Sequence, residues 1–353
     1  MAARPTGAWH AGCARSGPRH RRSYSTAQAR GPMHKEDSLQ VYVARRTWLQ
    51  RPMNEANLAH DQEFLRQLLA PLELREFLTR FYHCVPYSTQ GTAGQVLERF
   101  GWDDVARIVE SPGVDLVISR GGERLRVPLA RGFAQARALF EEGYTIGIRH
   151  AEQHHPYLGE IAARFGRVLA GPVDVHVYCT PPGKHGFGWH YDAEEVFIVQ
   201  VQGAKEFALR KNTVNPFPVV EAMSPGREFH AEQMPMMKCL LQPGDVLYIP
   251  SGYWHVGIGS EGECISLAIG VMPTTALTYL DFVKRRLLED IRWRVRWRVL
   301  ADSLQEHEEL GEQLRAELAA LAKQLRSLFE SPETLAAFLA ERRSLYENDA
   351  KQQ

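Results

Sequence analysis

The pattern with the clearest chemical potential is a histidine and an aspartate two residues apart, His190 and Asp192. In an extended segment, side chains at i and i+2 leave the same face of the chain, so both groups can reach one atom. A second histidine, His255, follows a strand-and-turn pattern that runs from Pro243 to Trp254. In an antiparallel barrel a late strand can return beside an early segment, and we expect this return to bring His255 to the pair.

Two imidazoles and one carboxylate on one side of a metal leave other coordination positions open. That arrangement is typical of non-heme Fe(II) oxygenases and differs from a closed structural zinc site. A short His-X-Asp pattern also arises by chance, so the surrounding residues decide between the two interpretations. We predict His190, Asp192 and His255 as the metal ligands and as the catalytic centre.

The elements that must position these residues change in character at Pro172. Before it, apolar residues mostly follow a helical period, and the Gly121-Gly122 pair between two short apolar runs indicates a hairpin. The predicted helices are 61–69, 72–81, 92–100, 103–110, 133–142 and 157–165. We interpret this part as a helical lead-in.

After Pro172 the period changes from 3.6 to 2, because valines at 173, 175 and 177 alternate with Asp174, His176 and Tyr178. One face of that strand is therefore polar. The predicted strands are 173–180, 196–202, 206–209, 246–249 and 264–271, separated by turns that contain proline or glycine. Short strands in this order predict an all-β barrel or jelly roll.

The pattern is helical again after Pro273. Apolar residues recur at three- and four-residue spacing along a first helix that reaches Val295, and then from Leu310 to Leu325. Trp293 and Trp297 form a second stripe, so we expect this first helix to bury two faces, one of them against a second subunit. Its arginine-rich stretch, 284–298, could contact phosphates, and direct binding of nucleic acid is left open.

Four separated blocks carry a family resemblance. They are YCTPPG at 178–183, GFGWHYD at 186–192, EVFIVQVQGAK at 195–205 and PGDVLYIPSGYWH at 243–255. Over roughly residues 71–272 the sequence resembles the JmjC-type cupin oxygenases of the ribosomal-oxygenase group. The resemblance implies an α+β fold: a cupin double-stranded β-helix, or jelly roll, with a helical lead-in and a C-terminal helical domain. We divide the chain into an extension at 1–37, disordered or started too early, a catalytic domain at 38–272 and a helical dimerisation region at 273–353.

The resemblance also implies roles for single residues. His190, Asp192 and His255 match the family's iron ligands, Lys205 matches the basic residue that pairs with the far carboxylate of 2-oxoglutarate, and Tyr178 matches a tyrosine that hydrogen-bonds the same co-substrate. Lys205 alternates with apolar residues, so a buried cation and a surface lysine are both compatible with the pattern. We expect His176, on the polar face with Tyr178, to hydrogen-bond in the cofactor pocket without binding the metal.

Three other features modify this picture. Gly270 falls where relatives carry a polar co-substrate contact. From the length after residue 273 we expect no counterpart of the winged-helix domain that follows the dimerisation helices in some relatives. The histidines at 150, 154, 155 and 185 are interpreted as exposed or capping residues. Of Glu194 and Glu195, one should face the barrel mouth and the other point away, and an acidic mouth would favour a cationic peptide.

The resemblance implies a dioxygenase that uses Fe(II), 2-oxoglutarate and O2 to hydroxylate a protein or peptide side chain, with an arginine or histidine of a ribosomal protein as one candidate. The alternatives are hydroxylation of a small molecule or peptide natural product, N-methyl-lysine demethylation, and a non-catalytic cupin. Loss of a ligand would indicate the last of these, and all three ligands are present.

Composition limits the partners. Basic and acidic residues balance at 42 each, so net charge points to neither nucleic acid nor a membrane. The five cysteines are scattered without a CxxC pair, which argues against a disulfide scaffold and favours a reducing cytoplasm. No apolar run approaches the roughly 18 residues of a membrane span. We expect a cytoplasmic homodimer without membrane contact.

Overall fold

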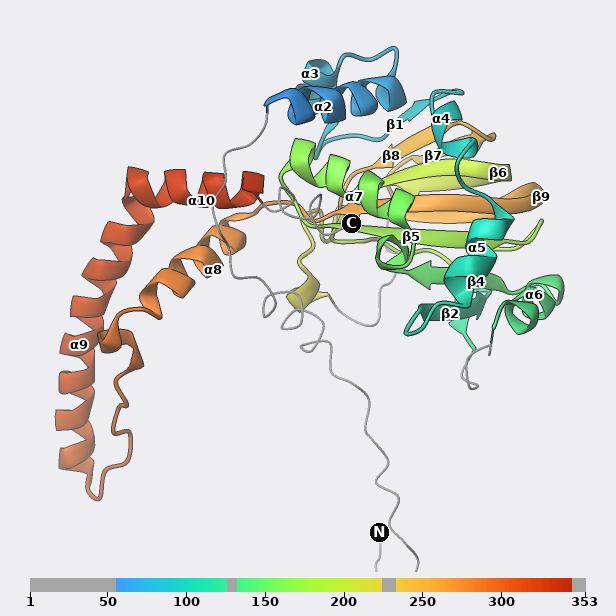
Figure 1. Cartoon of the computed structure of the whole chain (residues 1–353). Helices are drawn as coiled ribbons and strands as arrows, with labels where there is room; N and C mark the ends of the chain where they lie inside the picture. The colour runs from blue at the N-terminus through green and yellow to red at the C-terminus, as the bar shows by residue number, and fades with distance from the viewer. Residues whose placement is uncertain (1–54, 126–131, 224–232, 345–353) are drawn as a thin grey trace, which may run out of the picture. The chain divides into compact units, whose positions relative to one another are not determined.

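Figure 1 shows the computed structural model of the chain, which describes residues 55–125, 132–223 and 233–344. The predicted extension at 1–37 lies outside the described residues. The boundaries of the catalytic and C-terminal regions stay predictions.

The core of the described chain is an antiparallel sheet of nine strands in the order β1-β8-β6-β9-β5-β4-β2-β3, with β7 paired to β6. The strands are β1 Tyr87–Thr89, β2 Asp115–Arg120, β3 Glu123–Arg124, β4 Thr145–Arg149, β5 Val173–Thr180, β6 Glu195–Arg210, β7 Met236–Leu241, β8 Val246–Ile249 and β9 Trp254–Val271. The long strands β6 and β9 pair with each other, and β5 pairs with the other edge of β9. The predicted β architecture is confirmed.

Helices surround this sheet, and the predicted mixed α and β composition is confirmed (Figure 1). Those before the C-terminal region are α2 Glu55–Leu69, α3 Leu74–Glu76, the π-helix η1 Phe77–Phe81, α4 Gly94–Leu97, α5 Trp102–Val109, α6 Phe133–Glu141, the 3-10 turn η2 Ala151–Gln153, α7 Pro156–Leu169 and the 3-10 turn η3 Val220–Ala222. Of the predicted helices, 72–81 divides into α3 and a π-helix, and 92–100 shortens to one turn.

The alternation on β5 has the predicted consequence. Val175 and Val177 are fully buried in a core that also contains Ile161 and Phe165 of α7. The Phe165 ring packs edge-on against Phe197 of β6, with centroids 5.0 Å apart. Because one face of β5 belongs to this core, Asp174, His176 and Tyr178 emerge on the opposite face.

The structure corrects the predicted turn at Gly203. Instead of two strands, residues 195–210 form the single strand β6, with irregular pairing to β9 between Gln200 and Lys205. Gly203 has a φ of 65°, and a β-carbon there would lie 2.6 Å from the Glu263 carbonyl oxygen. A glycine is therefore needed at this bulge for a close approach of two backbones, and not for a chain reversal. Strands β1, β4 and β7 have no counterpart in the prediction.

The C-terminal region is helical, but its first helix ends earlier than predicted. The elements are α8 Ala276–Leu287, the 3-10 turn η5 Ile291–Arg294, α9 Leu304–Glu330 and α10 Pro332–Ser344. The carboxylate of Asp290 accepts a hydrogen bond from the Arg292 amide and begins the separate short turn. Trp293 packs within the chain, where its indole donates to Gln324 Oε1 at 2.9 Å. The predicted continuous helix 284–298 is wrong.

Two further expectations concern the surroundings of the protein. None of the helices described is both long and apolar enough to cross a bilayer. Cys84, Cys179, Cys239 and Cys264 are all free thiols. A cytoplasmic location stays a prediction.

Candidate metal and co-substrate site

The backbone brings His190 and His255 together. The amide of His190 donates to the His255 carbonyl at 3.1 Å, and the amide of His255 donates to the His190 carbonyl at 2.8 Å. This isolated antiparallel bridge joins the segment before β6 to the start of β9. The late strand thus returns beside the early segment, as the sequence predicts for the two histidines.

The three predicted ligands converge. Asp192 Oδ2 lies 3.7 Å from His190 Nε2 and 3.5 Å from His255 Nε2. Between them, Tyr191 turns the other way and packs edge-on against Trp254, with ring centroids 4.8 Å apart. The Asp192 carbonyl accepts from the Gly252 amide at 2.8 Å, which fixes this turn of backbone. The alternation predicted for 190–192 therefore holds without a regular strand.

Both histidines are oriented as metal ligands require. Nδ1 of His190 lies 3.0 Å from the Gly188 carbonyl oxygen, and Nδ1 of His255 lies 3.0 Å from the Tyr253 carbonyl oxygen. A carbonyl only accepts, so each Nδ1 donates a proton and each Nε2 keeps its lone pair free toward Asp192. These two carbonyl groups could not be predicted from the sequence, because their roles depend on local backbone geometry.

The donor set fits one divalent ion. Burial and the neighbouring His190 lower the pKa of His255 to about 4, so its imidazole is neutral at pH 7 and able to coordinate. Metal bonds of about 2.0–2.2 Å place neighbouring donors roughly 3–3.5 Å apart, close to the spacing observed here. The side chains of His190 and Asp192 are 29% and 37% exposed, which leaves one side accessible to further ligands.

Lys205 lies in the interior, and the alternative of a surface lysine is wrong. The residue is 6% exposed, and its ammonium donates to Thr180 Oγ1 of β5 at 3.2 Å. No carboxylate of the described chain forms an ion pair with it. Burial lowers the pKa of Lys205 to about 8. A β-carbon at Gly257 would lie 2.8 Å from Lys205 Cε, so this glycine makes room for the side chain.

A lysine buried without a counter-ion is costly, and its ammonium favours an anionic ligand. Its charge also acts on His255, which places the ammonium in the electrostatic neighbourhood of the three predicted ligands. Thr180 is a neighbour that the sequence interpretation did not single out.

Tyr178 and His176 lie on the polar face of β5, as predicted. His176 Nδ1 is 3.2 Å from the Tyr178 hydroxyl, and burial lowers the pKa of His176 to about 4. The Tyr178 ring lies 5.9 Å from the Lys205 ammonium and packs edge-on against Phe187, which in turn contacts His190. Contact of Tyr178 and His176 with a co-substrate stays a prediction.

The two glutamates after Asp192 separate as expected. Glu195 is 1% exposed, accepts a hydrogen bond from the Tyr248 hydroxyl and lies 2.8 Å from His83 Nδ1. Glu194 lies over Gly270, where a β-carbon would collide with its carboxylate. Burial raises the pKa of Glu194 to about 8, with smaller contributions from Asp192 and Asp174. Glu194 therefore occupies the space above Gly270, and it is less acidic than an ordinary glutamate.

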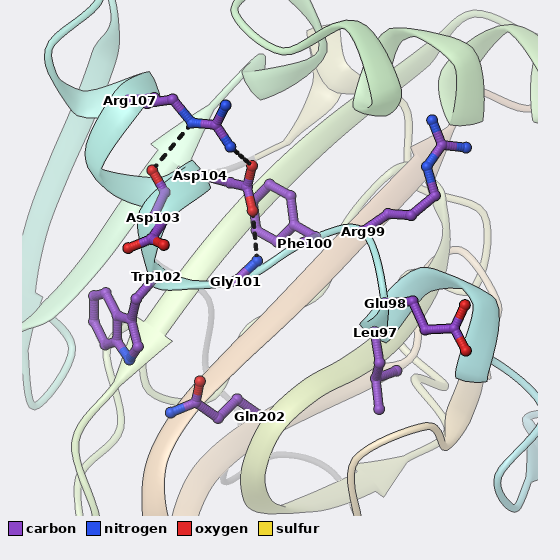
Figure 2. A pocket seen from close by; sticks show the side chains of 10 residues that line it. All are labelled: Leu97, Glu98, Arg99, Phe100, Gly101, Trp102, Asp103, Asp104, Arg107 and Gln202. Atoms are coloured by element: carbon purple, nitrogen blue, oxygen red, sulfur yellow. Dashed lines mark hydrogen bonds and ion pairs between the residues drawn. The ribbon is translucent and has the colours of Figure 1, made fainter.

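A surface pocket of about 480 Å³ lies away from these residues (Figure 2). It is lined by residues 97–104, Arg107 and Gln202. The Asp104 carboxylate at its wall already accepts from the Gly101 amide at 2.8 Å and binds Arg107 and His155. None of the predicted site residues lines this pocket, so we do not assign the chemistry to it.

Comparison with known proteins agrees with this geometry. Residues 153–279 match the family model described as the JmjC domain, and this range contains the three converging ligands and Lys205. The solved structure of YcfD, a ribosomal oxygenase from Escherichia coli in complex with cobalt and 2-oxoglutarate, aligns with a TM-score of 0.53 at 19% identity. The alignment covers 78% of this chain and 71% of that chain. The fold is that of a cupin of the JmjC type, with the predicted double-stranded β-helix, and residues 153–279 are similar to the JmjC domain.

Curated proteins are similar to part of this chain. The chain is 24% identical over 216 residues to the bifunctional lysine-specific demethylase and histidyl-hydroxylase NO66 of Aedes aegypti, covering 59% of this chain and 34% of that protein. It is 25% identical over 241 residues to mouse ribosomal oxygenase 2, covering 63% and 50%. The predicted resemblance to JmjC ribosomal oxygenases is confirmed. The chain spans a third to a half of the length of these relatives.

Proposed function

We propose that this chain is an Fe(II)- and 2-oxoglutarate-dependent dioxygenase that hydroxylates a side chain of a protein or peptide. The observation that carries the proposal is the convergence of His190, Asp192 and His255 near a buried Lys205 that has no carboxylate partner in the described chain. A divalent ion and a dicarboxylate satisfy both groups at once.

Each residue then has a definite task. The two imidazoles and the Asp192 carboxylate hold the ion on one side. Lys205 pairs with the far carboxylate of 2-oxoglutarate, and Tyr178 hydrogen-bonds the same co-substrate. When bound, Fe(II) and the co-substrate supply the oxidation that places one oxygen atom of O2 in a C–H bond and the other in succinate, with release of CO2. The buried surroundings of Lys205 and Tyr178 exclude water, and positioning selects the carbon that reacts.

The names of the relatives support a protein substrate, because they include ribosomal oxygenases and a histidyl-hydroxylase. Glu194, which is partly buried over Gly270, supports a side chain that forms hydrogen bonds, such as arginine or histidine of a ribosomal protein. A small metabolite or a peptide natural product is the rival substrate class.

The test is to incubate the full chain with Fe(II), 2-oxoglutarate and peptides from basic ribosomal proteins, with matched acidic peptides as the control. We expect basic peptides to gain the mass of one oxygen atom and to stimulate succinate release. Stimulation only by acidic peptides or by a metabolite would contradict the proposal and favour the rival class. The Asp192→Ala variant provides the blank for non-enzymatic oxidation.

Lysine demethylation is a second candidate, and the name of the NO66 relative favours it. The same oxidation at an N-methyl group would release formaldehyde and leave the peptide one methylene unit lighter. Mass spectrometry of N-methyl-lysine peptides in the same assay separates this outcome from hydroxylation. A non-catalytic cupin would give neither product.

We also propose a homodimer formed through the C-terminal region. Apolar side chains remain solvent-exposed between α8 and α9: Leu288, Ile291, Val295, Val299, Leu300 and Leu304. A cluster of this kind indicates a protein contact. Trp293 was predicted to face a second subunit, but it packs inside the chain. The proposed dimer contact is therefore made by the exposed aliphatic residues and not by Trp293.

The proposed dimer can be tested by introducing charged residues into this apolar surface. Sedimentation of the full chain at micromolar concentration should give a dimer, and the Ile291→Glu/Leu300→Glu variant should give a monomer because two carboxylates cannot be buried without partners. Val214→Glu, a change at another apolar residue that is 76% exposed, should leave the dimer intact. A monomeric wild type would overturn the proposal.

A further inference from the structure

A second cluster of metal-ligating side chains lies on β4 and β5. One donor atom each of His150, Asp174 and His176 lie within 4.8 Å of one another. Asp174 and His176 are at i and i+2 on the polar face of β5, and His150 directly follows β4, which pairs with β5. The cluster shares no residue with His190, Asp192 and His255.

Hydrogen bonds in this cluster leave coordination capacity unused. His150 Nδ1 lies 3.2 Å from Asp174 Oδ1. His176 uses Nδ1 toward the Tyr178 hydroxyl, and its buried Nε2 has no hydrogen-bond partner among the residues that the structure describes. Buried imidazole nitrogens are usually satisfied. When Nδ1 carries the proton and donates it to Tyr178, Nε2 offers a lone pair that calls for a ligand.

The charges around the cluster also favour a cation. Glu152 Oε1 lies 3.9 Å from His150 Nδ1, and its other oxygen accepts from the Val175 amide at 2.9 Å. Glu152 and Asp174 thus add two carboxylates to two imidazoles. The preceding cation in the chain, Arg149, directs its guanidinium to Asp115 at 2.5 Å.

We propose that His150, Asp174 and His176 bind a divalent ion of the imidazole-preferring class, such as Zn²⁺ or Co²⁺, with Glu152 within reach as a fourth ligand. Two imidazoles with one or two carboxylates are a suitable donor set for these ions. This site shares no ligand with the proposed oxygenase centre. Binding through Nε2 leaves Nδ1 of His176 as a donor to Tyr178, so the ion would also fix the orientation of that hydroxyl.

The test needs a variant in which the site of His190, Asp192 and His255 cannot bind a metal ion. In the full-length His190→Ala/Asp192→Ala variant, calorimetric titration with Zn²⁺ should still show about one ion bound, and Co²⁺ should give visible d–d absorption bands. Adding Asp174→Asn or His150→Ala should reduce the affinity by more than the roughly 10- to 100-fold that loss of an outer-shell partner causes. Circular dichroism confirms that each variant is folded.

His154→Ala is the matched control, because it removes a histidine from the same loop but outside the cluster. It should leave the titration unchanged. Failure of the His190→Ala/Asp192→Ala chain to bind Zn²⁺ would overturn the proposal. Binding that Asp174→Asn and His150→Ala do not affect would do the same, because it would place the ion elsewhere. Weaker binding of basic peptides to Asp174→Asn without any ion binding would instead assign the cluster to a cationic substrate side chain.

Discussion

Replacing Asp192 with alanine should remove both Fe(II) binding and 2-oxoglutarate turnover. The substitution takes away the only carboxylate among the three converging ligands and leaves two neutral imidazoles, which do not compensate the charge of the ion. We expect metal affinity to fall by roughly 100-fold or more, since loss of an outer-shell partner alone costs about 10- to 100-fold. Metal content after dialysis and succinate release report the two effects separately, and His190→Ala should behave in the same way.

The control for this experiment is Asp103→Ala, which removes a carboxylate in the first turn of α5, outside the converging ligands. It should retain the Fe(II) content and the turnover of the wild type. Succinate production at the wild-type rate in both Asp192→Ala and His190→Ala would show that the ion is held elsewhere.

The second large effect is expected at Lys205. Lys205→Ala should weaken 2-oxoglutarate binding by roughly 2–5 kcal/mol, because it removes one partner of a buried charge pair and leaves the carboxylate without compensation. Iron content should change little, since the ammonium contacts Thr180 and none of the metal ligands. Calorimetry of 2-oxoglutarate binding to the metal-loaded protein measures the loss. An affinity equal to that of the wild type would exclude Lys205 from the co-substrate site.

The depressed pKa of Lys205 also predicts a pH dependence. Without co-substrate the ammonium loses its proton near pH 8, and only the protonated form pairs with a carboxylate. Affinity for 2-oxoglutarate should therefore be complete below about pH 8 and fall about tenfold for each pH unit above it. Lys205→Arg keeps its charge throughout this range and should abolish the slope. A slope that persists in the arginine variant would point to another titrating group.

The convergence of the three predicted ligands could be predicted from the sequence because much of it depends on local rules. His190 and Asp192 are two residues apart, and the alternation of side chains needs only an extended backbone. The position of His255 could be predicted only by assuming that a late strand returns beside the segment of His190. The strand-and-turn motif before His255 supported that assumption. The burial of Lys205 could not be decided from the sequence, because alternation with apolar residues does not reveal whether both faces of the strand are covered.

Other features could not be derived from local pattern. His150 was assigned to an exposed or capping role, yet its imidazole bonds to Asp174, a residue 24 positions later on a neighbouring strand. Strand β4, which carries the chain to His150, is short and was not recognised. The end of α8 at Leu287 was missed for a related reason: apolar spacing continues past it, while the carboxylate of Asp290 and the contact between Trp293 and Gln324 favour a separate turn.

The paired backbone hydrogen bonds between His190 and His255 have a consequence for how the protein acquires its ion. They hold the two residues in register, and the Nδ1 contacts with the Gly188 and Tyr253 carbonyls orient the two rings, so the proposed coordination sphere is preorganised before any ion arrives. An ion can then leave and return without the chain refolding around it, unlike in small zinc modules that unfold when the metal is removed. Ions would therefore compete for the proposed site by coordination preference and cellular supply, and not by their ability to drive folding.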